Sequence, residues 1–362
     1  MKSVHPYENI PSEKLWKSFV PQQSWRDLKI ADEAKFKINP GSKIATAGSC
    51  FAQHIAKFLK NTGKSAYIVE KPHPILDSES QEYKSYELYT ARYGNIYTAR
   101  QCLELYLQAF GLIPMVEDYC IEDEKIYDLM RPQAVPEGFS SINEYREDRN
   151  YHLSCVRSMF ENSDIFVFTL GLTEAWFNKL SGHTYPVCPG TAKGVFDSEK
   201  HFFHNFNYSE IMADMEHLIE RLALINPTLK IILTVSPVSL VATNTRNNVL
   251  LASSYSKSVL RAVCGDIHEK YSNVQYFPSY EIINHCASFG QYLSDNLRDV
   301  SPRGIEHVMS VFDDTFMTGP HLHVSDNYSE GTLDADKDSS LLQFIEVECE
   351  ELMNDFSRKN EK

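Results

Sequence analysis

The sequence predicts an α/β protein in which helices cover both faces of a parallel sheet. Short apolar runs alternate with helical segments along the chain, and two of these runs are almost continuously apolar. Continuous apolarity is typical of strands that are covered on both faces, as in parallel sheets. The helical segments between the runs supply the crossovers that parallel strands need. Together these observations predict a doubly wound sheet.

Five apolar runs are the expected strands, at 43–49, 65–70, 164–171, 230–238 and 274–283. The third and fourth contain the β-rich segments Ile165–Leu170 and Ile231–Val235. The helical segments expected between them lie at 52–61, 98–110, 144–160, 208–225 and 250–271. In such a sheet the active site lies outside the carboxyl ends of the strands. Those ends are expected at Gly48-Ser49, Gly171 to Glu174, Ser236 to Val238 and Ser279 to Glu281.

The chain outside this alternation divides into an N-terminal extension (1–40), an insertion at about 112–143 and an acidic C-terminal tail (319–362). The body is therefore expected at 41–318. The insertion contains Cys120–Tyr127, which predicts a hairpin with a charged turn. The tail contains an amphipathic helix whose apolar face would dock on the body or form a homodimer. That face carries Leu341, Ile345, Cys349, Leu352 and Phe356.

The composition narrows the class of protein. The 362 residues are 43% hydrophobic, which is ample for a buried core, and the formal net charge is −14. An acidic chain disfavours nucleic acid and anionic membranes as main partners. No apolar run approaches the ~20 residues of a membrane span, and the N-terminus has no apolar signal core. The eight cysteines are scattered without a CxxC pair, which predicts reduced thiols in a cytoplasmic protein.

The first strand runs into a helix through the pair Gly48-Ser49. A serine at such a turn holds its hydroxyl at the carboxyl edge of the sheet, beside the backbone N–H groups of the helix start. Ser49 is therefore a candidate nucleophile. The alternative is an N-capping serine that satisfies the first amides of the helix.

The segment Gly48–Ala52 reads GSCFA, and the chain resembles the GSCFA family, which is placed in the SGNH (GDSL-like) hydrolase superfamily. The resemblance continues in order over about 40–315. It is carried by Tyr93–Thr98 (YGNIYT), Thr169–Trp176 (TLGLTEAW), Thr234–Val238 (TVSPV), Tyr255–Lys257 (YSK) and Tyr276–Glu281 (YFPSYE). It implies a flavodoxin-like α/β/α fold with a five-stranded parallel sheet and the serine after the first strand.

The SGNH pattern joins a serine nucleophile to oxyanion donors from the serine amide, a glycine amide and an asparagine side chain. The resemblance assigns Ser49 as the nucleophile and Gly94 as the glycine, although Gly94 is equally explained as a turn glycine with positive φ. The third strand ends Gly171-Leu172-Thr173-Glu174, where superfamily enzymes show Gly-x-Asn-Asp. Thr173 or Asn95 would then supply the missing donor, or Thr173 and Glu174 cap a following helix.

The base is where the sequence departs from the family. Many GSCFA sequences carry Asp-x-x-His-Pro-Ser after the last strand, whereas this chain has Asn296-Leu297-Arg298-Asp299-Val300-Ser301. Asp299 stands in place of the histidine, and the aspartate is replaced by Asn296 or shifted to Asp295. The candidates for the general base on this loop are His285 and Asp299. The alternative for His285 is an exposed loop histidine without a catalytic role. Asp299 would act as a base if burial raised its pKa, and is otherwise a solvated carboxylate beside arginine. His152 and His204 are flanked by apolar residues and are expected to be core histidines.

Two histidine pairs have ligand-like spacing, His201 with His204 and His321 with His323, but neither has a third ligand nearby in sequence. We therefore expect no metal and no cofactor. The predicted function is an SGNH-like serine esterase or O-acyltransferase that acts on a small-molecule or saccharide ester. The acyl group would be carried on Ser49, and the ester could be an acylated sugar or polysaccharide unit. The alternatives are a binding module that has lost its base and a partner protein in surface-polysaccharide assembly.

Overall fold

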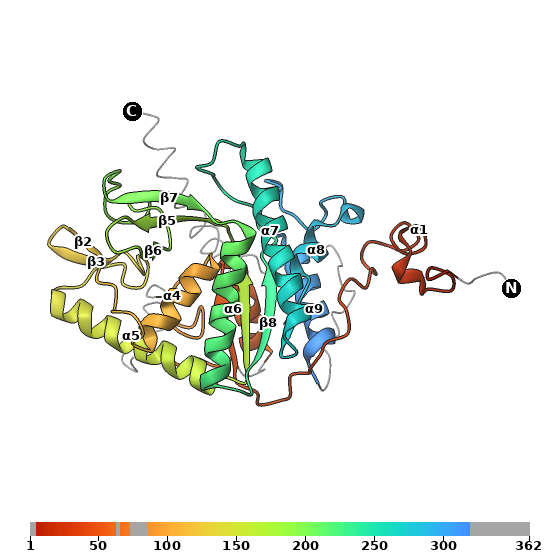
Figure 1. Ribbon diagram of the computed structural model, residues 1–362, viewed down its shortest axis with the longest axis horizontal. Coiled ribbons are helices and arrows are strands. Elements are labelled where there is room, and N and C mark those ends of the chain that lie inside the picture. Colours follow the sequence, from red (N-terminus) through yellow and green to blue (C-terminus); the bar gives the residue numbers. More distant parts are fainter. Residues whose placement is uncertain (1–4, 63–65, 73–84, 319–362) are drawn as a thin grey trace, which may run out of the picture.

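The computed structural model describes residues 5–62, 66–72 and 85–318. Its centre is a parallel sheet in the order β1-β4-β8-β9. Figure 1 labels β8 of this sheet near the middle of the molecule. The strands are β1 (Ile44–Gly48), β4 (Ile165–Leu170), β8 (Lys230–Val235) and β9 (Val274–Tyr276). The α/β class and the parallel sheet predicted from the apolar runs are confirmed.

The predicted five-stranded sheet is not what the described residues form. The run at 65–70 contributes a single bridge, from Ala66 to Ile44 on the side of β1 opposite β4. Three residues further on, the Val69 N–H donates to Thr90 O instead of continuing along β1. The fifth run is also shorter than expected, because Pro278 has no N–H with which to extend the ladder. The chain then turns into the helix α8 (Ser279–Asn284).

Helices cover both faces of this sheet. The helices against one face are α4 (Ala99–Ala109), α5 (Ile142–Asn162), α6 (Tyr208–Ile225) and α7 (Val249–Lys270). The helices against the other face are α2 (Cys50–Asn61), α8 and α9 (Pro302–Phe316). Alternate strand residues serve the two cores: Phe166 and Phe168 pack with the first set, and Ile165 and Val167 pack with the second.

A second, antiparallel sheet follows β4 directly. Its order is β6-β5-β7, from β5 (Glu174–Asn178), β6 (Thr184–Tyr185) and β7 (His201–Asn205). The alternative in which Thr173 and Glu174 cap a helix is therefore wrong, because Glu174 pairs with Asn205 as the first residue of β5. The predicted hairpin is confirmed as β2 (Tyr119–Glu122) and β3 (Lys125–Asp128), which lies beside this sheet on the left of Figure 1.

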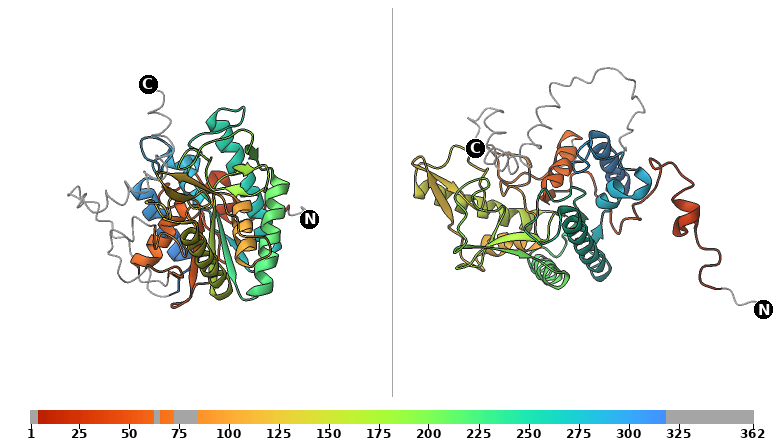
Figure 2. Two further views of the ribbon diagram at one scale, coloured as in Figure 1. Left: turned by 90° about the vertical axis from the view of Figure 1, so that its left-hand side faces the viewer. Right: turned by 90° about the horizontal axis from the view of Figure 1, so that it is seen from above.

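The N-terminal segment holds the short helices η1 (Ser12–Lys14) and α1 (Trp16–Phe19). Figure 2 shows it extending away from the α/β body. In the parts of the chain that are described, no helix is long and apolar enough to cross a membrane. The amphipathic helix predicted at 341–356, and the homodimer contact assigned to it, lie outside the described residues.

Buried charges join the insertion to the body. Glu70 is 1% exposed, and its carboxylate accepts the backbone N–H of Arg92 at 2.8 Å and lies 2.7 Å from Nδ1 of His152. Burial alone would raise the pKa of Glu70, but His152 and Arg131 outweigh it and lower the pKa to about 2. His152, predicted to be a core histidine, is fully buried in this cluster.

We expect Glu70→Gln to lower the free energy of unfolding at pH 7 by about 3 kcal/mol, because it removes one partner of a buried charged cluster. The pKa of Glu70 lies below its ordinary value in the folded protein. The stabilisation is therefore present above pH about 4.5 and is lost as the pH falls towards 2. Urea titrations at several pH values should show that the free energy of unfolding falls less at acidic pH in Glu70→Gln than in the wild type.

The matched control is Glu161→Gln, which removes an exposed carboxylate paired with Arg157 at 2.8 Å within α5. Exposed pairs at this spacing contribute about 0.3–0.5 kcal/mol, so this variant should follow the wild-type pH curve. If the free energy of unfolding falls equally at acidic pH in Glu70→Gln and in the wild type, the lowered pKa of Glu70 does not stabilise the fold.

Candidate active site

Ser49 lies at the end of β1, where the chain enters α2. Gly48 has a φ of +139°, and a Cβ there would lie 2.4 Å from Thr169 O, so only glycine allows this close approach between β1 and β4. Ser49 occupies the N-cap position of α2, but its side chain makes no capping hydrogen bond. Its hydroxyl is buried and has no hydrogen-bond partner among the described residues. The capping alternative therefore does not account for Ser49.

A cavity of about 480 Å³ opens in front of Ser49. The lining residues include Gly171 and Ser236, which follow β4 and β8. The expectation that these three residues share one edge of the sheet is confirmed. Trp176 and Phe203 of the second sheet form part of the wall, with ring centroids 5.5 Å apart. The antiparallel sheet therefore walls the carboxyl edge of the parallel one.

Gly171 is in direct contact with Ser49. A Cβ built on Gly171 would lie 2.9 Å from Ser49 Cβ, closer than side chains allow, and 3.3 Å from Tyr97 O. The Gly171 N–H donates to Tyr97 O at 3.0 Å, and the Ser49 N–H donates to Thr169 O at 3.1 Å. Both amides thus have backbone acceptors in this structure, including the serine amide that the superfamily pattern uses as an oxyanion donor.

Glu174 brings a carboxylate to the cavity. It accepts a hydrogen bond from the Thr243 hydroxyl at 2.6 Å and another from the Asn244 N–H at 3.3 Å. Burial raises the pKa of Glu174, although these two hydrogen bonds act in the opposite direction. Thr173 does not line the cavity; it is fully buried, and its N–H donates to Ser256 Oγ at 3.1 Å.

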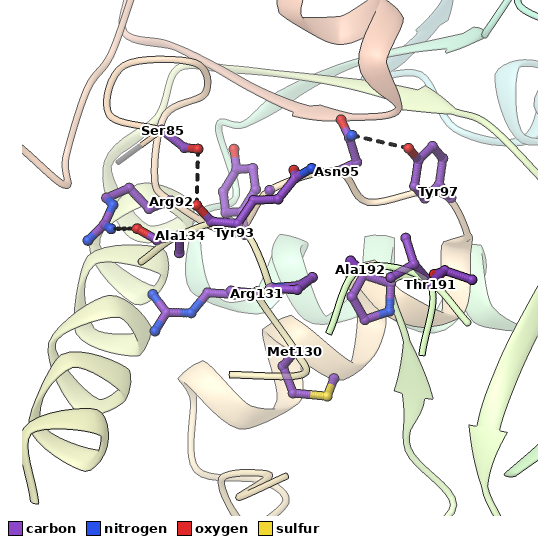
Figure 3. Close-up of a pocket in the computed structure, with 15 residues that line it drawn as sticks. Ser85, Arg92, Tyr93, Asn95, Tyr97, Met130, Arg131, Ala134, Thr191 and Ala192 are labelled. Atoms are coloured by element: carbon purple, nitrogen blue, oxygen red, sulfur yellow. Dashed lines mark hydrogen bonds between the residues drawn. The ribbon is translucent and has the colours of Figure 1, made fainter. Parts of the chain in front are cut away.

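Gly94 and Asn95 line a smaller neighbouring cavity of about 50 Å³ (Figure 3). The Asn95 side-chain amide donates to the Tyr97 hydroxyl at 3.1 Å, as the dashed line in Figure 3 shows. Tyr97 lines both cavities, and the Tyr89 hydroxyl lies 2.5 Å from Asn95 Oδ1 and 3.1 Å from Ser49 O, so Asn95 is close to the Ser49 backbone. Gly94 has a φ of +69° with open space around its Cα, which agrees with its interpretation as a turn glycine.

Neither candidate base on the last loop is among the residues that line the cavity. The carboxylate of Asp299 accepts hydrogen bonds from the Asn296 side chain at 2.6 Å and from the Arg298 guanidinium. Arg298 itself lines the cavity, so Asp299 reaches the site through Arg298. Asp299 is thus a carboxylate beside an arginine, with 25% of its side chain exposed.

His285 lies in a different environment. Its ring contacts that of Tyr292, with centroids 6.3 Å apart, and both ring nitrogens are buried without a hydrogen-bond partner in the described part of the chain. Burial lowers the pKa of His285, so its imidazole is neutral at pH 7. Of the two other histidines considered, His152 lies in the Glu70 cluster. The prediction that His204 is a core histidine is wrong, because 37% of its side chain is exposed and its Nε2 lies 2.8 Å from Glu210.

Sequence reasoning missed three residues around Ser49, namely Tyr97, Arg298 and Lys257. Tyr97 and Lys257 belong to segments that carry the family resemblance, which is the one signal that could have found them. No group of three His, Cys, Asp or Glu side chains among the described residues is arranged to hold a metal ion. The seven cysteines in those residues form no disulfide, and Cys50 directly follows Ser49.

These features define a class, an α/β protein with a buried serine at a strand-to-helix turn that faces a cavity at the carboxyl edge of the sheet. The chain belongs to the GSCFA family, whose model matches residues 43–312. No curated protein matches this sequence.

Two solved structures resemble the chain at low similarity. One is a carbohydrate esterase family 3 structure from Talaromyces cellulolyticus, with 10% identity, a TM-score of 0.34, and coverage of 75% of this chain and 95% of that one. The other is a mutant of Axe2, an acetyl-xylooligosaccharide esterase from Geobacillus, with 13% identity, a TM-score of 0.32, and coverage of 80% and 100%. Similarity at this level carries no argument about the activity of this chain.

Proposed function

We propose that this protein is an SGNH-like serine ester hydrolase in which Ser49 carries the acyl group. The observation that supports this most strongly is the Ser49 hydroxyl, which is buried at the start of α2, lines a cavity of about 480 Å³ and has no hydrogen-bond partner among the described residues. A buried hydroxyl without a partner costs stability, so its retention calls for a role other than packing. The family to which the chain belongs is placed in the SGNH superfamily, which agrees with this proposal.

The chemistry follows from the position of Ser49. Its oxygen attacks the ester carbonyl, the alcohol leaves, and water or a second alcohol removes the acyl group. Transfer to an alcohol would make the protein an O-acyltransferase. Gly94 remains the proposed oxyanion donor together with either Thr173 or Asn95, although none of the three lines the cavity at Ser49 in this structure.

The proposed substrate is an ester larger than a free acetate ester, such as an acylated saccharide. The cavity size lies within the range of small-molecule sites. Trp176 and Phe203 offer flat apolar surfaces, while Glu174 and Arg298 provide polar contacts at the same cavity. An apolar wall with a few polar groups suits a ligand that has both an acyl chain and hydroxyl groups.

One observation favours a second candidate function, a binding protein that kept the fold and cavity. The two positions where the family pattern has aspartate and histidine are Asn296 and Asp299, and their side chains bond to each other at 2.6 Å. This pair reproduces the contact between an aspartate and its histidine but contains no imidazole to take up a proton. A binding protein of this kind could act as a partner in surface-polysaccharide assembly.

Acyl-enzyme trapping distinguishes the two functions. The protein is mixed briefly with p-nitrophenyl esters of increasing acyl length, quenched in acid and digested. An ester hydrolase should release p-nitrophenol, and mass spectrometry should find the acyl group on the peptide that contains Ser49. Saturable binding of acylated saccharides without any turnover or adduct would support the binding protein instead.

We expect Asp299→Asn to lower kcat/KM for such an ester on the order of 10²-fold, because it releases Arg298 and misplaces a cavity group. The paired variant His285→Ala should leave kcat/KM unchanged, since His285 packs against Tyr292 outside the cavity. Steady-state kinetics at pH 7 measure both. If instead His285→Ala lowers kcat/KM and Asp299→Asn does not, His285 and not Asp299 is the residue of this loop that supports catalysis.

A further inference from the structure

Lys257 is a buried lysine at the same edge of the sheet as Ser49. It lies in α7, is 2% exposed, and its Nζ donates to Gly171 O at 2.8 Å. No carboxylate within the described ranges forms an ion pair with it. Burying an ammonium group without an anionic partner is costly, and lysine is rarely buried in this way. The position of this side chain therefore calls for an explanation in terms of chemistry.

Gly171 contacts both Lys257 and Ser49. The carbonyl of Gly171 accepts the Lys257 hydrogen bond, and the Cα of Gly171 faces Ser49 so closely that a Cβ there would lie 2.9 Å from Ser49 Cβ. Lys257 approaches from α7, on one face of the sheet, and Ser49 begins α2, on the other face. The amine and the hydroxyl therefore lie on either side of one glycine, without a hydrogen bond between them in this structure.

The environment of Lys257 favours the neutral amine. Burial lowers the pKa of Lys257 to about 7. The other groups whose charge reaches it are the thiol of Cys50, which raises the pKa, and the guanidinium of Arg298, which lowers it. At pH 7 to 8 a large fraction of the amine therefore has a lone pair with which to accept a proton, unlike an exposed lysine.

We propose that Lys257 is the general base for Ser49, accepting the hydroxyl proton directly or across one water as the serine oxygen attacks an ester. This inference rests on the proposed function. The Oγ–H bond breaks and an N–H bond forms on Lys257, while an Oγ–C bond forms at the acyl carbon. The C–O bond to the alcohol then breaks, and the Lys257 ammonium returns its proton to the leaving oxygen. Water attacks the acyl group in the same way, giving its proton to Lys257, and the proton ends on Ser49.

The other titratable groups near the site are less suited to this role. The carboxylate of Glu174 is held by Thr243 and Asn244. That of Asp299 is held by Arg298 and Asn296, and the His285 ring packs against Tyr292. Lys257 does not line the cavity either, but it donates a hydrogen bond to Gly171, which does. For Lys257, the hydrogen bond to Gly171 O uses one N–H and leaves the nitrogen lone pair of the neutral amine available.

The test measures the rate at which a fluorophosphonate labels Ser49, as a function of pH, in the full-length protein. The wild-type rate should rise with a midpoint near pH 7, the value at which Lys257 loses its proton. Lys257→Met and Lys257→Arg should both label more slowly, on the order of 10²–10⁴-fold, and lose this midpoint. The arginine variant keeps a cation for Gly171 O but cannot accept a proton. Added primary amines should restore labelling of Lys257→Ala, faster for more basic amines.

The matched control is Lys270→Met, which removes an exposed lysine at the end of the same helix, 2.5 Å from Glu216. Its labelling rate and pH profile should equal those of the wild type.

If Lys257→Arg labels at the wild-type rate, or if the wild-type rate has no midpoint near 7, Lys257 is not the base and Ser49 can still be the nucleophile. If wild-type Ser49 is not labelled at any pH and no ester is hydrolysed, the proposed function fails, and the role of Lys257 fails with it. The wild-type profile decides the question even if Lys257→Met does not fold.

Discussion

Ser49→Ala should abolish both ester hydrolysis and labelling by a fluorophosphonate. We expect kcat/KM to fall on the order of 10⁴-fold or more, because a nucleophile cannot be replaced by a methyl group and only residual binding contributions remain. The overall fold should be unchanged, since the Ser49 hydroxyl makes no hydrogen bond within the described residues and its loss breaks none. Removing a buried polar atom without a partner is expected to keep or slightly raise the free energy of unfolding.

The control for this variant is Ser236→Ala. Ser236 lines the same cavity and also follows a strand of the parallel sheet, but its Oγ accepts the Val238 N–H at 3.3 Å. Ser236 should not be labelled in the wild type, and its variant should retain labelling at Ser49. If a fluorophosphonate still labels Ser49→Ala, another residue is the nucleophile and the proposed mechanism is wrong.

Gly48→Ala should destabilise the protein strongly. The added Cβ would lie 2.4 Å from Thr169 O and 2.7 Å from Thr169 N, which are backbone atoms that no side-chain rotation can move. The φ of +139° adds strain for any residue other than glycine. We expect the free energy of unfolding to fall by about 3 kcal/mol or more, measured by urea titration.

Gly41→Ala separates the two causes. Gly41 also has a positive φ, +86°, but nothing lies within 4 Å of a Cβ built there. This variant should therefore lose only the cost of the backbone conformation, about 1 kcal/mol. Equal losses in the two variants would show that the contact between Gly48 and β4 is looser than the structure indicates.

The sequence was sufficient where the determining interactions are local or strongly periodic. The helices α6 and α7 begin and end within one residue of the ranges predicted from apolar periodicity, because each has a capping asparagine, Asn207 or Asn248. The buried strands β4 and β8 were evident because both faces of each strand are covered and the runs are apolar almost throughout. The turn at Ser49 was evident because a strand, a glycine and a helix follow one another without a gap.

The sequence was insufficient where partners come from distant segments. The run at 65–70 has the composition of a strand, but Val69 bonds to Thr90 rather than to β1, and that choice depends on how the chain returns. A capped helix after Thr173 was one interpretation of the sequence, and no strand was expected there. Its pairing with β7, which begins at His201, decided for a strand.

By itself, the sequence determined the α/β class, the parallel core and the serine at the end of the first strand, because apolar periodicity and glycine stereochemistry are properties of short segments. The tertiary structure alone decided what surrounds that serine. It buried Lys257 against Gly171, placed Arg298 at the cavity and directed His285 towards Tyr292. The physical reason is that burial and charge coupling, which govern the reactivity of a lysine or a histidine, arise only when segments far apart in the chain pack together.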